Sequence, residues 1–116
     1  MRLILFPLFC FAQHHPWFLQ TLDEPDGYFT IDRITRQSYI ALFQRYGVKQ
    51  IFAGHYHRNA IGFASSLEMV TTAPVGKPLG KDPSGLRIVI VSQKGITHRY
   101  YGLDELHTTI DTRREK

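Results

Sequence analysis

A short apolar run that ends in two closely spaced histidines restricts how this chain can fold and act. Residues 48–53 read as a strand, and Gly54, His55, Tyr56 and His57 follow at once. Side chains at positions i and i+2 of an extended chain project to the same side, roughly 6–7 Å apart along the backbone. We therefore predict that His55 and His57 present two imidazoles that suit two metal ions about 3.5–4 Å apart. The alternative is a surface loop that happens to contain two histidines.

A second pair of histidines follows a second apolar run. Residues 8–12 are continuously apolar, as expected for a strand covered on both faces, and Gln13, His14, His15 and Pro16 come next. Pro16 disfavours helix at the residue before it, so an extended loop is predicted. In open α/β sheets, ligands gather at the carboxyl ends of the strands. We expect the two histidine loops to converge, and clustered imidazoles indicate zinc, iron or manganese.

The rest of the chain supplies one helix and several short strands. Residues 30–46 follow the helical period, with Thr30 as the expected cap and Gly47 as the expected stop. The side chains expected to face a core are Ile34, Tyr39, Leu42, Phe43 and Tyr46. Further strands are predicted at residues 61–64, 68–72, 86–92 and 96–101, before a short helix within 103–109. This order of elements predicts an α/β fold.

The composition of the chain limits its size as a domain and the kinds of partner that it is expected to bind. With 116 residues, 43% hydrophobic and 21% charged, the chain can build the core of about one domain. The net charge of +4 is not concentrated in a run mixed with aromatic residues, so no nucleic-acid partner is expected. No apolar run approaches the ~20 residues of a membrane span. Cys10 is the only cysteine, which excludes an intrachain disulfide and fits the cytoplasm. The oligomeric state stays open.

The first twelve residues allow two interpretations. Arg2 followed by the apolar residues 3–11 loosely matches a signal peptide. Against this, the basic region is a single residue, and Cys10 stands where a small residue is usual, two positions before Ala12. A buried strand is the preferred interpretation. At the other end, the basic run 113–116 is expected to be solvated.

The histidines alone do not complete a site for two metal ions. Neutral imidazoles leave the charge of the ions uncompensated, and such sites normally include carboxylates, one of them often shared. The acidic loop at 21–30 and Asp82 lie far from both histidine pairs in sequence, and their carboxylates are expected to be solvated. His98 and His107 are expected to be structural or surface residues. The sequence therefore predicts part of a metal site that lacks its anionic ligands.

The two histidine stretches, residues 13–18 and 54–59, resemble the last two motifs of calcineurin-like metallophosphoesterases. The match extends through residues 82–87 and 98–106, in the same order and at the same spacing, and covers about residues 11–106. These stretches look like the branch of serine/threonine-protein phosphatases with a calcineurin-like phosphoesterase domain. The family's earlier motifs, Asp-x-His, Gly-Asp-x-x-Asp and Gly-Asn-His-Asp/Glu, do not occur here.

The resemblance implies a fold and a domain organisation. Residues 11–106 correspond to the C-terminal half of a metallophosphoesterase β-sandwich flanked by helices, here an incomplete domain. Residues 1–10 form a divergent N-terminal segment, and residues 107–116 form a polar tail. The missing motifs supply the bridging aspartate, an asparagine ligand and the histidine that protonates the leaving group in that family.

The resemblance also implies roles for single residues. His14 would be a metal ligand that shares the second ion with His55, and His57 would bind the first ion. The residues implied beside the substrate are His15, Arg58 and Asn59. The cofactors implied are two divalent or trivalent ions, Fe, Mn or Zn.

The implied activity is hydrolysis of a phosphoester by a metal-activated water. Two ions lower the pKa of a bridging water and clamp the phosphate oxygens, so no protein nucleophile is needed. The substrate would be a phosphorylated protein or another phosphoester. Two alternatives remain open. The chain could be a catalytically inactive truncated isoform or interaction fragment. It could also be a single-zinc module that uses His14, His55 and His57.

Overall fold

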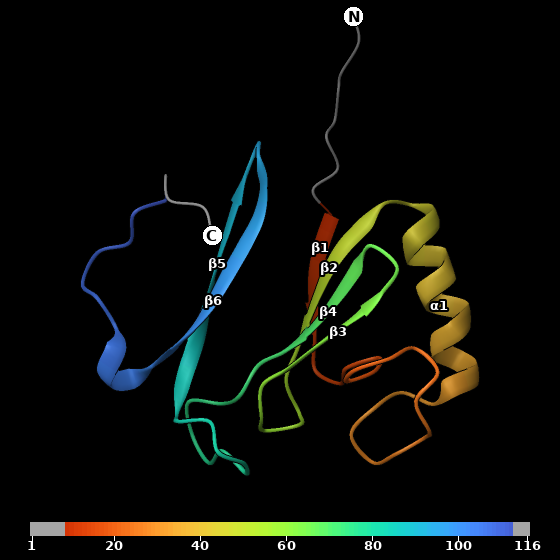
Figure 1. Ribbon diagram of the computed structural model, residues 1–116, viewed down its shortest axis with the longest axis horizontal. Helices are drawn as coiled ribbons and strands as arrows, with labels where there is room; N and C mark the ends of the chain where they lie inside the picture. The colour runs from red at the N-terminus through yellow and green to blue at the C-terminus, as the bar shows by residue number, and fades with distance from the viewer. Residues whose placement is uncertain (1–8, 113–116) are drawn as a thin grey trace, which may run out of the picture.

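Two β-sheets of unequal size and one helix form the structure, a computed structural model that describes residues 9–112 (Figure 1). The larger sheet has four strands in the order β1-β2-β4-β3. Their bounds are β1 Phe9–Gln13, β2 Val48–Ala53, β3 Ala60–Ala64 and β4 Leu67–Thr71. Strands β1, β2 and β4 run parallel, and β3 pairs antiparallel with β4. The predicted α/β class is confirmed.

The smaller sheet is a hairpin of β5 (Gly85–Ser92) and β6 (Gly95–Gly102), which pair antiparallel. A single 3₁₀ turn at Leu103–Glu105 follows, so the terminal helix expected to reach residue 109 is much shorter than predicted. Two predictions concern residues that lie largely or wholly outside the described part of the chain. They are the choice between a signal peptide and a strand at the N-terminus, and the solvation of the basic run 113–116.

The four-stranded sheet has a different covering on each face. Helix α1 (Arg33–Arg45) lies against one face and the β5–β6 hairpin stands against the other (Figure 1). Because side chains alternate along a strand, Ile51 joins Ile40 of α1 in the core, whereas Phe52 turns to the hairpin, with its ring 5.4 Å from that of His98. The core comprises Trp17, Phe18, Ile40, Ile51, Ala53, Ala64, Leu67 and Met69.

Helix α1 begins two to three residues later than predicted and turns a different face to the core. Asp32, not Thr30, is the cap, and its carboxylate accepts a hydrogen bond from Thr35 N at 3.0 Å. The buried positions of the helix are Arg36 and Ile40, while Ile34 is 83% exposed. The expectation that Ile34, Leu42 and Tyr46 face a core is wrong, because all three are exposed. Tyr39 is partly exposed but stacks on the core residue Trp17, and Phe43 is half-buried against the core.

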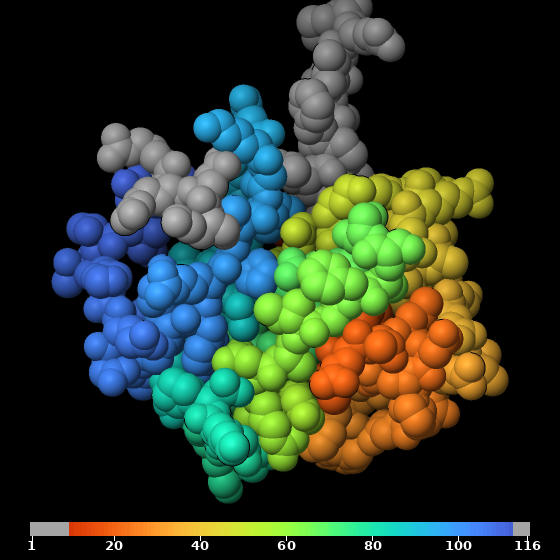
Figure 2. Space-filling view, viewed as in Figure 1, coloured from red at the N-terminus to blue at the C-terminus, as the bar shows by residue number. Residues whose placement is uncertain are grey.

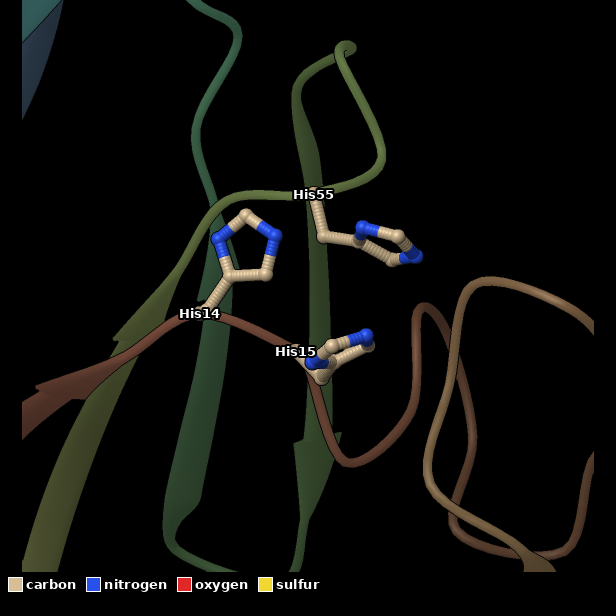
Figure 3. A group of neighbouring side chains, drawn as sticks. All are labelled: His14, His15 and His55. Atoms are coloured by element: carbon tan, nitrogen blue, oxygen red, sulfur yellow. The ribbon is translucent and has the colours of Figure 1, made fainter.

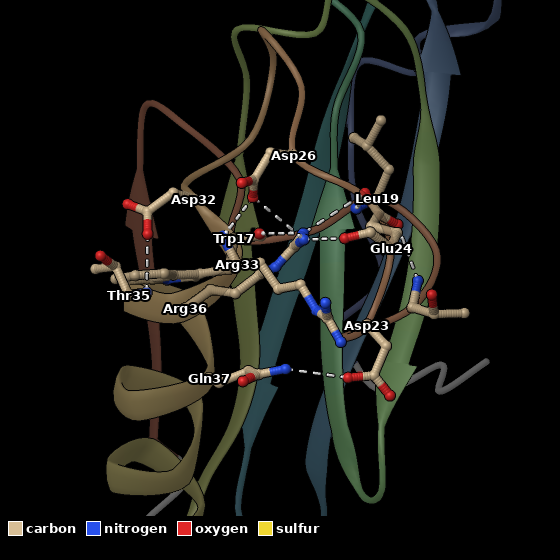
Figure 4. A network of polar contacts seen from close by, with 11 residues as sticks. Trp17, Leu19, Asp23, Glu24, Asp26, Asp32, Arg33, Thr35, Arg36 and Gln37 are labelled. Atoms are coloured by element: carbon tan, nitrogen blue, oxygen red, sulfur yellow. Dashed lines mark hydrogen bonds and ion pairs between the residues drawn. The ribbon is translucent and has the colours of Figure 1, made fainter.

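The loop between β1 and α1 is held by a buried ion network (Figure 4). Arg36 donates hydrogen bonds to the carbonyls of Trp17 and Glu24, and its guanidinium lies 3.9 Å from the Glu24 carboxylate. The Glu24 carboxylate in turn accepts from the backbone amides of Leu19, Gln20 and Thr21. The expectation that the carboxylates of this loop are solvated is therefore wrong for Glu24, because it organises the loop.

The same loop lies directly on β3. A Cβ atom added at Gly62 would stand 2.5 Å from the carbonyl oxygen of Gln20, a separation that no real side chain tolerates. Figure 2 shows the two segments side by side on one face, the loop in orange and β3 in green. Glycine at this position therefore allows the loop backbone to lie flat against the sheet edge.

Candidate metal centre

The two histidine loops meet because their strands are neighbours in register. Gln13 at the end of β1 pairs with Ala53 at the end of β2, so the residues that follow emerge level with each other. Gly54 N then donates a hydrogen bond to His14 O at 3.0 Å, which joins the loops directly. The predicted convergence of the two strand ends therefore occurs.

Three imidazoles gather at this point: those of His14, His15 and His55 (Figure 3). One ring nitrogen from each lies within 4.8 Å of the other two. The ring centroids of His15 and His55 are 4.1 Å apart, and those of His14 and His55 are 5.0 Å apart. We call His14, His15 and His55 the histidine centre. Within residues 9–112, no carboxylate belongs to it.

The electrostatics of the histidine centre suit a cation. Burial, followed by the neighbouring charges of His55 and His14, lowers the pKa of His15 below its ordinary value. The neutral imidazole is the form that binds metal. The Nε2 atom of His55 is buried and has no hydrogen-bond partner, which is costly for a polar atom unless something binds it. Three imidazole ligands, one of which has an unsatisfied nitrogen, fit a zinc, iron or manganese ion.

His57 is not a member of the histidine centre. Its Nδ1 lies 3.0 Å from the carbonyl oxygen of Lys77, and its own carbonyl accepts from Leu79 N at 3.0 Å. The extended backbone predicted for residues 55–57 is wrong, because His55 has φ 64° and His57 has φ 59°. In this left-handed conformation the alternation of side chains along a strand no longer applies. The structure thus brings His15 rather than His57 to His14 and His55.

Arg58 and Asn59 have different surroundings. The Arg58 guanidinium lies over the rings of Tyr56 and Phe29, at 4.7 Å and 5.6 Å from their centroids. No carboxylate of residues 9–112 pairs with it. Asn59 is engaged within the protein, because its Oδ1 accepts from Ala73 N at 2.9 Å and from Arg87 at 3.0 Å.

Aromatic residues beside the histidine centre were not predicted from the sequence. The rings of Tyr28 and Phe29 lie 5.2 Å and 5.7 Å from the ring of His55. Tyr28 is 79% exposed. The only sequence signal for them is two adjacent aromatic residues after an acidic turn, which by itself predicts a loop.

The two remaining histidines lie elsewhere. His98 Nε2 is hydrogen-bonded to Glu68 Oε1 at 3.1 Å, in agreement with the structural role expected for His98. His107 lines a cavity of about 650 Å³ between the hairpin and the C-terminal segment, together with Tyr101 and Ile110. This cavity is separate from the histidine centre, which does not line it.

Known proteins with similar sequences are serine/threonine-protein phosphatases. The chain is 49% identical over 94 residues to the serine/threonine-protein phosphatase CPPED1 of Rattus norvegicus and 50% identical over 94 residues to that of Danio rerio. It is 50% identical over 95 residues to that of Homo sapiens. Each match covers 81% of this chain and 30% of the relative. No protein-family model and no solved structure matches the chain.

This likeness is long enough to establish ancestry. A sequence identity near one half over more than ninety residues does not arise by chance, and the matched residues make up most of the chain. Among residues 9–112, no helix is both long and apolar enough to cross a bilayer. The chain spans 30% of the length of the curated relatives it matches. Over the matched residues the chain is similar to the serine/threonine-protein phosphatases CPPED1, and it spans less than one third of the length of such a protein.

Proposed function

We propose that this chain provides the histidine part of the metal centre of a metal-dependent phosphoester hydrolase of the calcineurin-like type. The observation that carries the proposal is the meeting of His14, His15 and His55 at two adjacent strand ends, with ligand nitrogens within 4.8 Å of one another. The names of the relatives, serine/threonine-protein phosphatases, support a phosphorylated protein as the class of substrate. A cytoplasmic location, expected from the cysteine content, is part of the same proposal.

His14 and His55 are the proposed ligands of one ion, with His15 within reach of it. His57 is proposed as a ligand of a second ion. Its Nδ1 donates to the Lys77 carbonyl, which leaves Nε2 with a free lone pair, the arrangement usual for metal-bound histidine. Zinc, iron or manganese bound here would acidify a water molecule and polarise the phosphoryl oxygen.

Arg58 is the proposed contact for the substrate phosphate. Its guanidinium is held over two aromatic rings without a carboxylate partner in residues 9–112, so its donors remain available. A planar guanidinium binds phosphate oxygens through two parallel hydrogen bonds. Arg58 belongs to the same loop as His55, which places the anion contact close to the proposed ions.

The anionic ligands are proposed to come from outside the matched segment. No carboxylate of residues 9–112 joins the histidine centre, and the relatives have further sequence beyond the part matched here. In this proposal residues 11–106 form the C-terminal part of the phosphoesterase domain, with residues 1–10 as a divergent segment and residues 107–116 as a polar tail.

A chimera tests the proposal directly. The segment of human CPPED1 that matches this chain is replaced by the chain's own residues, and hydrolysis of p-nitrophenyl phosphate is measured with Mn²⁺, Fe²⁺ or Zn²⁺. We expect metal-dependent turnover that falls by about 10–100-fold or more on His55→Ala, because losing a ligand disturbs the bound ion. His107→Ala, which lies away from the histidine centre, is the matched control. Unchanged turnover in the His14→Ala and His55→Ala chimeras would contradict the proposal.

A second candidate is a site for a single ion. Three nitrogen ligands with one open position is the usual arrangement of catalytic zinc. The grouping of His14, His15 and His55, without His57, favours this candidate. The number of metal ions bound by the active chimera separates the two: one ion per chain with full turnover supports the single-ion site, and two support the dinuclear centre.

A further inference from the structure

A half-buried arginine on the hairpin holds the far end of the histidine loop, residues 54–59. Arg87 of β5 donates through Nε to Thr72 Oγ1 at 3.0 Å and through Nη2 to Asn59 Oδ1 at 3.0 Å. Its Nη1 lies 3.0 Å from His98 Nδ1. Each arm of the guanidinium therefore contacts a different segment: the continuation of β4, the histidine loop and β6.

His98 and Glu68 fix the direction of this guanidinium. Arginine can only donate, so the Nδ1 atom of His98 accepts and its Nε2 carries the proton. Nε2 then donates to Glu68 Oε1 of β4 at 3.1 Å. The hairpin and the four-stranded sheet are joined through this chain of hydrogen bonds, and Arg87 cannot swing away from the loop without breaking it.

Asn59 transmits the contact to the backbone of the loop. Its side-chain Oδ1 accepts hydrogen bonds from both Arg87 and Ala73 N. Its backbone N–H donates to Asp82 Oδ2 at 2.9 Å. The loop is thus anchored at its end by three hydrogen bonds. At its start, the Gly54 amide is bonded to His14 O.

The loop needs such anchoring because its backbone is strained. His55 and His57 both have positive φ, a conformation that is unfavourable for residues other than glycine and persists only when the surroundings enforce it. A loop released at Asn59 can relax to ordinary backbone angles. The imidazole of His55 would then leave the position in which it meets His14 and His15.

We propose that Arg87 is a positioning residue for the histidine centre: through Asn59 it holds residues 54–59 in the strained conformation that brings His55 to His14 and His15. This inference rests on the proposed function, because it assigns to Arg87 the preorganisation of the proposed metal ligands. The guanidinium bonds to Thr72, His98 and Asn59, and none of these belongs to the histidine centre. It acts through Asn59, across the space between the two sheets.

The test measures metal affinity and loop order in the full chain. Co²⁺ affinity is read from its absorption bands, and hydrogen exchange is measured at the amides of Gly54, Tyr56 and Asn59. For Arg87→Met we expect a loss of Co²⁺ affinity of about 10–100-fold, as for other residues that orient metal ligands. We also expect faster exchange at the three loop amides, with the amides of α1 unchanged.

Further variants separate positioning from folding. Arg87→Lys keeps the charge but cannot contact three segments at once, so an intermediate loss is expected even if Arg87→Met folds poorly. Asn59→Leu should reproduce the effect of Arg87→Met on the loop. Arg99→Met is the matched control, because Arg99 stacks on Tyr101 of the same hairpin and should leave both measurements unchanged.

The outcomes are distinguishable. Wild-type affinity and wild-type loop exchange in Arg87→Lys and Asn59→Leu would overturn the inference, as would a loss of thermal stability without either change. If the wild-type chain bound no Co²⁺, or if His14→Ala and His55→Ala bound it equally well, the proposed function would fail. The exchange data would in that case still decide whether Arg87 orders the loop.

Discussion

Replacing Glu24 by glutamine is expected to destabilise the chain by far more than an ordinary loop substitution. The Glu24 carboxylate accepts hydrogen bonds from the amides of Leu19, Gln20 and Thr21 at 2.9, 2.8 and 3.0 Å. It also lies 3.9 Å from the buried Arg36 guanidinium. Glu24→Gln keeps one acceptor oxygen, turns an NH₂ group towards the amides and removes the charge opposite Arg36.

The magnitude follows from these contacts. A hydrogen bond to a charged group is worth about 1.5–3 kcal/mol, and a buried donor left unsatisfied costs about 1–3 kcal/mol. Because one oxygen remains, we expect a loss of about 2–4 kcal/mol in the free energy of unfolding. For a domain of this size, that corresponds to a fall in Tm of roughly 8–16 °C.

The pH dependence of the same variant provides a second measurement. Burial alone would raise the pKa of Glu24, but the backbone hydrogen bonds and the charge of Arg36 together lower it below its ordinary value. A lowered folded-state pKa means that the stabilisation is present above the pKa of the unfolded chain, near 4.5, and is lost as the pH falls through the lower folded value. The difference between wild type and Glu24→Gln should therefore be constant near neutrality and shrink in acid.

Thermal unfolding between pH 3 and pH 8 measures both effects. Asp23→Asn is the matched control, because Asp23 makes only an exposed contact with Gln37 and should change Tm by no more than about 2 °C. A Glu24→Gln protein that melts within 2 °C of wild type at neutral pH would refute the role given to this carboxylate. So would a destabilisation that stays the same down to pH 3.

Three further predictions can be checked with the same protein. Gly62→Ala should lower Tm by several degrees, since its Cβ would meet the Gln20 carbonyl at 2.5 Å, whereas Gly27→Ala, with open space around it, should not. His14→Ala and His55→Ala should each weaken Co²⁺ binding by at least tenfold in an absorption titration, because each removes one of three grouped ligands. The chain alone should bind an apolar dye, because it exposes side chains such as Phe63. It should show no metal-dependent hydrolysis of p-nitrophenyl phosphate, because within residues 9–112 no carboxylate joins the histidines. A chain that binds no dye and hydrolyses this phosphoester would contradict the prediction.

The positions of the strands could be predicted because most of them are short apolar runs with clear ends. The apolar period of α1 was less informative. It suggested a buried Ile34, but the side chain that the helix buries beside Ile40 is Arg36. A buried arginine becomes acceptable only when its partners are in place, and Glu24 is supplied by a loop twelve residues earlier. The apolar pattern of the helix does not reveal that Arg36 has such a partner in a distant loop.

The candidate site also has features that the sequence predicts and features that it does not. The meeting of His14 and His55 follows from two parallel neighbouring strands, which the sequence predicts. The position of His57 depends on left-handed backbone at both His55 and His57, a conformation that is uncommon for residues other than glycine and that the apolar pattern of the strand does not indicate. Arg87 was missed because its link to Asn59 spans the two sheets, far apart in sequence.

The histidine centre draws its donors from two segments that have the whole of α1 between them. Such a constellation does not exist in the unfolded chain, so an ion that occupies it shifts the folding equilibrium as well as the chemistry. At a free ion concentration one hundred times the Kd, this linkage amounts to about 2.7 kcal/mol. Metal supply would then govern how much folded protein persists, and a chelator would act as a denaturant.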